Sequence, residues 1–98
     1  MLEPYEEEVI LRMYDKNYAG MNYKSIQRIA ASIKWADISN TYGVKKKFSR
    51  VLKHLIAKGY VDPHGKSGDV ASLSRMGVEY AFAKRRMDDG RAVTPLLP

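Results

Sequence analysis

The sequence predicts a mainly α-helical domain of the α+β class, with three helices followed by a two-stranded β-hairpin and a further helix. In residues 44–61, apolar residues recur at the spacing of a helix that buries one face: Val44, Phe48, Val51, Leu52 and Leu55. Two short β-prone segments follow, at 60–62 and 70–73, and flank a loop that contains Pro63, Gly65 and Gly68. Such a pair is typical of a hairpin.

The composition predicts one globular domain. The chain has 98 residues, of which 45% are hydrophobic and 29% charged, and this length suffices for a single modest core. We expect the domain in residues 1–90 and a flexible tail in residues 91–98, which contain two prolines. The chain has no cysteine, no apolar run near the ~18–20 residues of a membrane span and an acidic start unlike a secretion signal. We therefore expect a cytoplasmic protein.

The first two helices are predicted at residues 4–17 and 23–33. Pro4 suits the first position of a helix, and Glu6, Glu7 and Glu8 suit its positively polarised first turns. The second helix has a buried stripe at Ile26, Ile29, Ala30 and Ile33, with Asn22 as its expected N-cap. Residues 34–43 are expected to form a long turn that Trp35 and Ile38 attach to the core.

The last helix is predicted from an N-cap at Ser74 to about residue 88, with Gly90 as its stop. It carries two apolar stripes, and one of them, Val78, Ala81 and Phe82, can close the core. We expect the other to form a homodimer interface: Met76, Tyr80, Ala83 and Met87. The alternative is that a small core buries this helix on both sides.

The positive charge of the chain is concentrated in one segment. The sequence has 17 Lys and Arg against 11 Asp and Glu, a net charge of +6. No acid lies between Asp37 and Asp62, whereas six bases do: Lys45, Lys46, Lys47, Arg50, Lys53 and Lys58. The rest of the chain is balanced, so the excess indicates a surface that contacts a polyanion.

Two segments of this sequence resemble a known family. FSRVLKHLIAKGYV, at 48–61, is similar to the end of the recognition helix and the first wing strand of winged helix-turn-helix transcription regulators. LSRMGVEYA, at 73–81, is similar to their post-wing segment, where Leu-Ser/Thr-x-x-Gly opens the closing helix. The resemblance covers about residues 22–85. It implies a three-helix core, a two-stranded wing, an additional C-terminal helix, DNA contacts by the third helix and wing, and often a homodimer. Small archaeal regulators of this form make an archaeal source the expectation.

We predict that the chain binds double-stranded DNA and regulates transcription. Arg50 is the expected base reader, because its planar fork matches O6 and N7 of guanine. The predicted DNA-binding residues are Lys24, Ser25, Arg28, Tyr42, Lys45, Lys46, Lys47, Ser49, Arg50, Lys53, His64 and Lys66. The alternative is a winged-helix module for protein interaction or RNA binding in a larger assembly, such as a replication or ribosomal complex. RNA recognition would favour exposed aromatic side chains for stacking.

The sequence offers no constellation for catalysis, and we expect no enzyme, cofactor, metal or small-molecule ligand. Gly65-Lys66-Ser67 resembles the end of a phosphate-binding loop, but Gly59 lies one residue too far upstream and a strand rather than a helix follows. Two histidines without cysteine are too few for a metal site by themselves.

Overall fold

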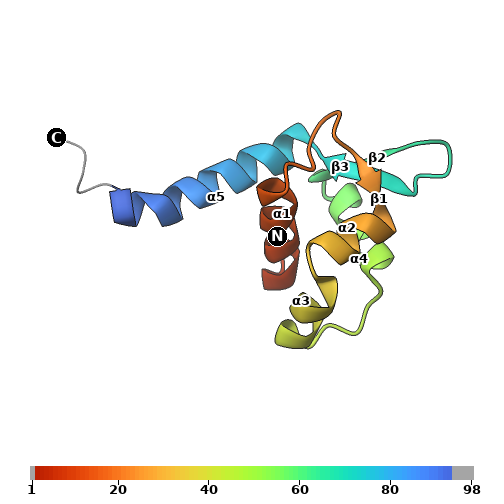
Figure 1. The fold of residues 1–98 in the computed structure, drawn as a ribbon, viewed down its shortest axis with the longest axis horizontal. Coiled ribbons are helices and arrows are strands. Elements are labelled where there is room, and N and C mark those ends of the chain that lie inside the picture. The colour runs from red at the N-terminus through yellow and green to blue at the C-terminus, as the bar shows by residue number, and fades with distance from the viewer. Residues whose placement is uncertain (1, 94–98) are drawn as a thin grey trace.

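The computed structural model describes residues 2–93, with side chains for residues 2–87. This part of the chain is an α+β fold, mainly helical, with five helices and three strands (Figure 1). The elements are, in chain order, α1 (Pro4–Asp15), β1 (Lys24–Ser25), α2 (Ile26–Ser32), α3 (Trp35–Tyr42), α4 (Phe48–Ala57), β2 (Val61–His64), β3 (Val70–Leu73) and α5 (Arg75–Val93). The predicted α+β class is confirmed.

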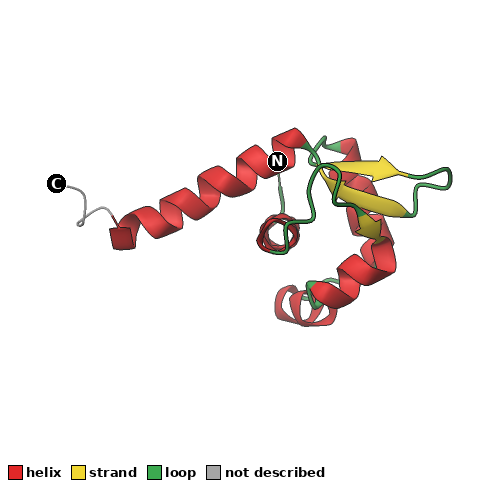
Figure 2. Cartoon of the chain, turned by 45° about the horizontal axis from the view of Figure 1, so that its top comes forward, coloured by secondary structure: helices red, strands yellow, loops and turns green. Residues whose placement is uncertain are grey.

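The sheet has three antiparallel strands in the order β1-β3-β2 (Figure 2), so the prediction of two strands is wrong. β2 and β3 are the predicted hairpin, and β1 pairs with the free edge of β3 through Lys24 and Ala71. The second helix consequently begins later than predicted. Its N-cap is Ser25, whose hydroxyl accepts a hydrogen bond from the Arg28 amide at 3.2 Å, and not Asn22.

Residues 34–43 contain the helix α3, so the prediction of a turn without helix is also wrong. Two residues with left-handed backbone bound it, Lys34 at φ 59° and Gly43 at φ 66°. Glycine adopts that conformation readily, which is why helices commonly end beside it. Trp35 packs near Phe48, with ring centroids 5.3 Å apart, and Ile38 is buried. These two residues attach the segment to the core, as predicted.

The core is formed mainly by α1, α2, α4 and the sheet. It contains the predicted face of α4, where Phe48, Val51, Leu52 and Leu55 are buried. α4 begins at Phe48, later than the apolar pattern suggested, so Lys45, Lys46 and Lys47 lie in the loop before it. The remaining buried apolar residues are Val9, Ile10, Leu11, Met13, Ile29, Ile33, Ile38, Val61, Ala71, Leu73 and Ala81.

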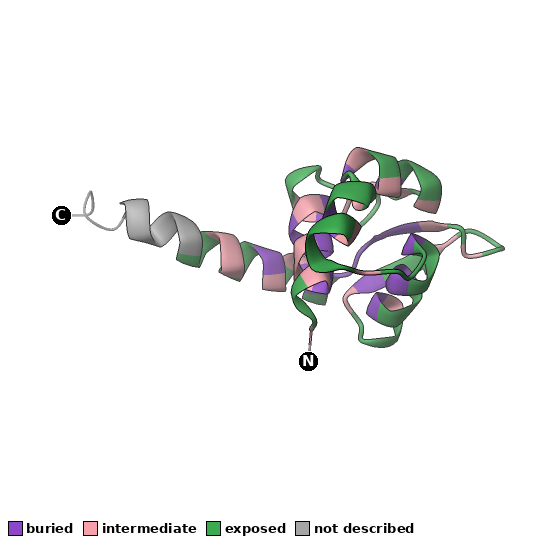
Figure 3. Ribbon diagram, turned by 90° about the horizontal axis from the view of Figure 1, so that it is seen from below, coloured by how far each residue is buried: buried purple, intermediate pink, exposed green. Residues whose placement is uncertain are grey.

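The helix α5 starts as predicted but ends later. The Ser74 hydroxyl accepts a hydrogen bond from the Gly77 amide at 3.1 Å, as expected for an N-cap. The helix continues through Gly90 to Val93, because one glycine disfavours a helix by only about 1 kcal/mol. Residues 91–93 of the predicted tail are therefore helical, and residues 94–98 lie outside the described residues. Figure 3 shows that α5 runs away from the rest of the domain.

The first three turns of α5 are attached to α1 by polar contacts. The Tyr80 hydroxyl donates a hydrogen bond to the Glu7 carboxylate, and the ring of Tyr80 meets that of Tyr60 edge-on at 5.6 Å. Burial raises the pKa of Tyr80, and with the Glu7 carboxylate beside it the pKa reaches about 12. The Arg85 guanidinium donates to Asp15 at 3.1 Å. The acids of α1 thus fix the direction in which α5 leaves the domain.

Candidate nucleic-acid interface

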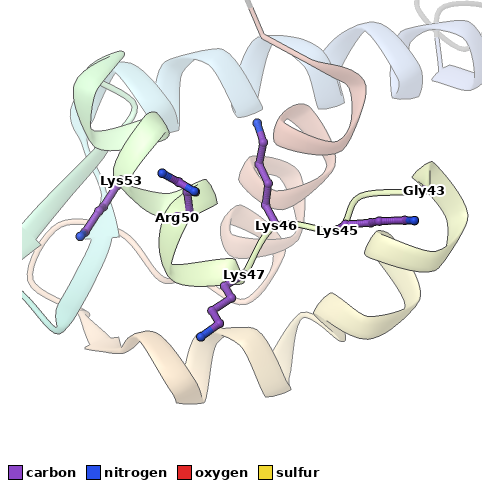
Figure 4. A pocket seen from close by; sticks show the side chains of 6 residues that line it. All are labelled: Gly43, Lys45, Lys46, Lys47, Arg50 and Lys53. Carbon is purple, nitrogen blue, oxygen red and sulfur yellow. The ribbon is translucent and has the colours of Figure 1, made fainter.

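The outer face of α4 is cationic, because four of its apolar residues are buried on the opposite face. With Phe48, Val51, Leu52 and Leu55 in the core, Ser49, Arg50 and Lys53 are exposed on the opposite side. The α3–α4 loop continues this surface at the start of the helix. Together they form a cleft of ≈ 760 Å³, which we call the basic cleft, lined by Gly43, Lys45, Lys46, Lys47, Arg50 and Lys53 (Figure 4).

No carboxylate of the described residues neutralises the basic cleft. Among the described residues, none of its five cations takes part in an ion pair. Other cations of the domain do lie against acids: Arg12, Lys58, Arg75, Lys84 and Arg85. Five unpaired like charges repel one another, and an external anion relieves that repulsion. The cleft is therefore suited to an anionic ligand.

Lys58 does not belong to this cleft, although the sequence placed it among the six clustered bases. Its ammonium lies 2.7 Å from the buried Glu6 carboxylate at the far end of α4. This contact joins α4 to α1 and leaves five clustered cations, not six.

The cationic side chains of the basic cleft spread apart. In Figure 4 the side chains of Lys45, Lys46 and Lys47 leave one loop in three different directions. The Lys46 ammonium lies 3.3 Å from the Tyr5 hydroxyl and 6.0 Å from the centre of the Tyr5 ring, so α1 holds it at the edge of the cleft. Charges separated in this way match a row of phosphates better than one small anion.

A second cleft, of ≈ 310 Å³, lies between the start of α2, the first turn of α4 and the residue before β3. Four of its five lining residues have polar side chains, one of them an acid, and we call it the polar cleft: Ser25, Ile26, Gln27, Ser49 and Asp69. The Ile26 amide donates to the Asp69 carbonyl oxygen at 2.9 Å, which joins the start of α2 to the chain before β3. The structure thus brings the predicted residues Ser25 and Ser49 together. Gln27 and Asp69 were not predicted, since neither has a local sequence signal.

In the β2–β3 hairpin, the two predicted residues differ in their surroundings. Lys66 is exposed in the loop, whereas His64 is half-buried and stacks on Tyr23, with centroids 4.4 Å apart and planes at 21°. The Ser72 hydroxyl donates to the Gly20 carbonyl oxygen at 2.8 Å and lies 3.0 Å from His64 Nε2. Because Ser72 donates its hydroxyl proton to Gly20, its oxygen accepts a hydrogen bond from the Nε2–H of His64. His64 and the unpredicted Tyr23 therefore hold the hairpin against the segment before β1.

The other predicted residues lie outside both clefts. Arg28 is exposed on α2, Lys24 is half-buried in β1, and Tyr42 is 44% exposed at the end of α3. Of the residues predicted for dimerisation, Met76 (43% exposed), Ala83 and Met87 (69% exposed) are open to solvent, whereas Tyr80 contacts α1.

Comparisons with protein-family models, with curated proteins and with solved structures find no match for this chain. Within the described residues, no three His, Asp or Glu side chains gather as potential metal ligands. None of the described helices has both the length and the apolar composition of a membrane span.

Proposed function

We propose that this protein is a winged helix-turn-helix regulator of transcription that binds double-stranded DNA. In this proposal α1, α2 and α4 are the three-helix core, α4 is the recognition helix, and β2 and β3 form the wing. The observation that carries it is the basic cleft, with five cations unpaired among the described residues. A helix ~10–12 Å across fits the ~12 Å major groove, and phosphates on either side would neutralise the flanking lysines.

The unexpected helix α3 supports the same function. It lies between α2 and α4, and the loop that returns from its end carries three consecutive lysines beside the first turn of α4. No acid occupies that first turn, and no side chain among the described residues caps the helix. The positive end of the helix dipole therefore adds to the attraction for phosphate. In our proposal the loop contacts the DNA backbone, while Arg50 is placed to reach a guanine.

Affinity for duplex DNA is expected to depend on Lys53 and on salt. Lys53→Ala should weaken binding to all sequences by a similar factor and make the slope of log affinity against log salt shallower by about one.

Arg50→Ala should cost about 1–3 kcal/mol of binding free energy on a preferred DNA sequence and less on a random one. Fluorescence anisotropy at several salt concentrations measures both. The matched control is Lys16→Ala, an exposed lysine at the end of α1 and outside the cleft. Equal effects of Lys16→Ala and Lys53→Ala would contradict the assignment of the cleft.

The class of nucleic acid is tested by a gel-shift comparison of duplex DNA, single strands and structured RNA. We expect the duplex to bind most tightly. Tyr42, Tyr23 and Phe82 are the exposed rings of the described residues, and unpaired bases could stack on them. The RNA-binding function would replace DNA regulation if RNA binds more tightly than the duplex and Tyr42→Ala abolishes that binding.

We also propose that the protein acts as a homodimer joined through α5. Met76, Ala83 and Met87 are exposed at the spacing i, i+7, i+11, which places them on one helix face. The outer half of α5 extends beyond the domain, as Figure 1 shows, and a single helix of about 12 residues is marginal in water. A second copy of α5 packed along this face would stabilise it. Two-fold pairing would also bring two copies of α4 to half-sites about 34 Å apart.

The double substitution Ala83→Glu, Met87→Glu is expected to yield a folded monomer that binds DNA far more weakly. Both side chains are exposed, so the domain keeps its core while like charges meet across the dimer axis. Tyr80 is left unchanged because glutamate there would face Glu7. Light scattering gives the mass and circular dichroism the fold, with Met87→Leu as a control that retains the interface. A wild-type protein that stays monomeric at high concentration would rule the dimer out.

A further inference from the structure

The polar cleft differs in charge from the basic cleft beside it. Ser25 and Gln27 come from the start of α2, Ser49 from the first turn of α4, and Asp69 from the residue before β3. All four are exposed. Ser49 precedes Arg50 directly, so the two clefts meet at the start of the proposed recognition helix. A single surface thus has a cationic half and a second half whose one charged side chain is the carboxylate of Asp69.

Asp69 is the unusual member of this cleft. In the described part of the chain its carboxylate takes part in no ion pair and accepts no hydrogen bond. Its position is nevertheless fixed, because its carbonyl oxygen accepts from the Ile26 amide and the next residue, Val70, pairs with Ser25 in the sheet. A carboxylate near phosphate is repelled. On duplex DNA a carboxylate therefore contributes favourably to binding only where it accepts a hydrogen bond from a donor.

The major groove offers such donors as the exocyclic amino groups of cytosine (N4) and adenine (N6). The neighbours of Asp69 have complementary chemistry. The Gln27 carboxamide can donate and accept together, which is the pattern that adenine N7 and N6 require. The Ser25 oxygen already accepts from the Arg28 amide, so its proton remains to be donated. The cleft therefore presents both donors and acceptors within reach of one helix start.

We propose that the polar cleft reads bases, and that Asp69 accepts a hydrogen bond from the amino group of a cytosine in the major groove, with Gln27 reading the neighbouring base pair. This assignment rests on the proposed function and divides it between the two clefts. The basic cleft provides affinity by neutralising phosphates, which carries no sequence information. The polar cleft provides the choice of sequence. Specificity then depends on α2 and the chain before β3 as well as on α4.

The test uses the 98-residue chain and a library of random duplexes to obtain base-preference profiles. Asp69→Asn keeps the shape of the side chain, removes its charge and adds a donor. We expect it to lower the preference for cytosine at one position by roughly tenfold, while the other positions keep their preferences. Gln27→Ala should relax an adjacent position. Asp62→Asn, an exposed carboxylate on β2 that lines neither cleft, is the matched control and should leave the profile unchanged.

The outcomes separate this inference from the function on which it rests. If Asp69→Asn tightens binding to all duplexes equally, the carboxylate only repels phosphate and reads no base. Wild-type binding without any base preference would likewise overturn the base-reading assignment, while the Lys53→Ala salt dependence would still support the basic cleft. If the wild-type protein binds no duplex at all, both proposals fail. Thermal unfolding of each variant shows that the fold is retained.

Discussion

Replacing Gly77 with alanine is expected to destabilise the domain by about 3 kcal/mol or more, although an alanine in a helix normally stabilises it by about 1 kcal/mol. A Cβ atom at Gly77 would lie 2.2 Å from the carbonyl oxygen of Tyr60 and 3.2 Å from Leu73 Cδ2. The first of these is a backbone atom that cannot rotate away. The same oxygen accepts a hydrogen bond from the Ser74 amide at 3.0 Å, so moving it would also disturb the start of α5.

Urea unfolding followed by circular dichroism measures this effect. The matched control is Ala31→Gly, an exchange in the opposite direction at an exposed position of α2, which should cost only the usual ~1 kcal/mol of helix propensity. A Gly77→Ala variant as stable as the wild type would show that α5 and the segment before β2 can separate. We expect the variant to unfold as one unit, since the contact joins α5 to the core.

The contact at Gly77 also gives a physical reason for one sequence signature. In Leu73-Ser74-x-x-Gly77, the leucine is in the core, the serine caps α5, and the glycine lets α5 approach Tyr60 closely. These three roles fix the angle at which α5 leaves the domain. In a dimer joined through α5, that angle would determine the separation of the two α4 helices on DNA.

The elements that sequence periodicity predicted well are those with many buried residues. Of the ten residues of α4, four are buried and produce a clear apolar stripe. Of the eight residues of α3, only Ile38 is buried. Its helix is instead bounded by the left-handed residues Lys34 and Gly43, which produce no periodic signal. The strand β1 has two residues and is extended because it pairs with β3, about 45 residues later in the chain. Neither element could be derived from local pattern.

The same distinction applies to the candidate site. The cations of the basic cleft were predictable, because Lys45, Lys46 and Lys47 are contiguous and Arg50 and Lys53 share the outer face of α4. Gln27 and Asp69 were missed because their proximity depends on the pairing of β1 with β3. Lys58 was misassigned for a related reason, since its partner Glu6 lies 52 residues away.

Loss of the Glu6 carboxylate is expected to destabilise the domain by about 2 kcal/mol at neutral pH. Glu6 is only 1% exposed, and its Oε1 accepts from the Glu3 amide at 2.8 Å and from the Lys58 ammonium at 2.7 Å. Burial raises the pKa of Glu6, but these two contacts together with the charge of His54 outweigh it and hold the pKa below its ordinary value of 4.5. Breaking a fully buried ion pair costs ~3–5 kcal/mol of stability. The expected loss is smaller here because the Lys58 side chain is 33% exposed.

The sign of the pH dependence follows from the lowered pKa. The folded state binds the Glu6 proton more weakly than the unfolded chain does, so this carboxylate stabilises the fold above about pH 4.5. That contribution is lost as the pH falls through the lower, folded pKa. Glu6→Gln lacks the titrating group. Its stability should therefore be well below that of the wild type at pH 7 and approach it under acid conditions.

Urea unfolding of the wild type and Glu6→Gln between pH 7 and pH 3 tests this expectation. The control is Glu79→Gln, an exposed acid whose ion pair among the described residues is with Arg75 of the same helix. Parallel stability curves for wild type and Glu6→Gln would show that the buried pair makes no net contribution to stability.

Lys58→Met should lower the free energy of unfolding at pH 7 more than Glu6→Gln does, because it leaves a buried carboxylate without its ammonium partner. Since Glu6 and Lys58 lie away from both clefts, each folded variant should retain the duplex affinity of the wild type. A loss of affinity without unfolding would mean that α1 positions α4 on DNA through this pair.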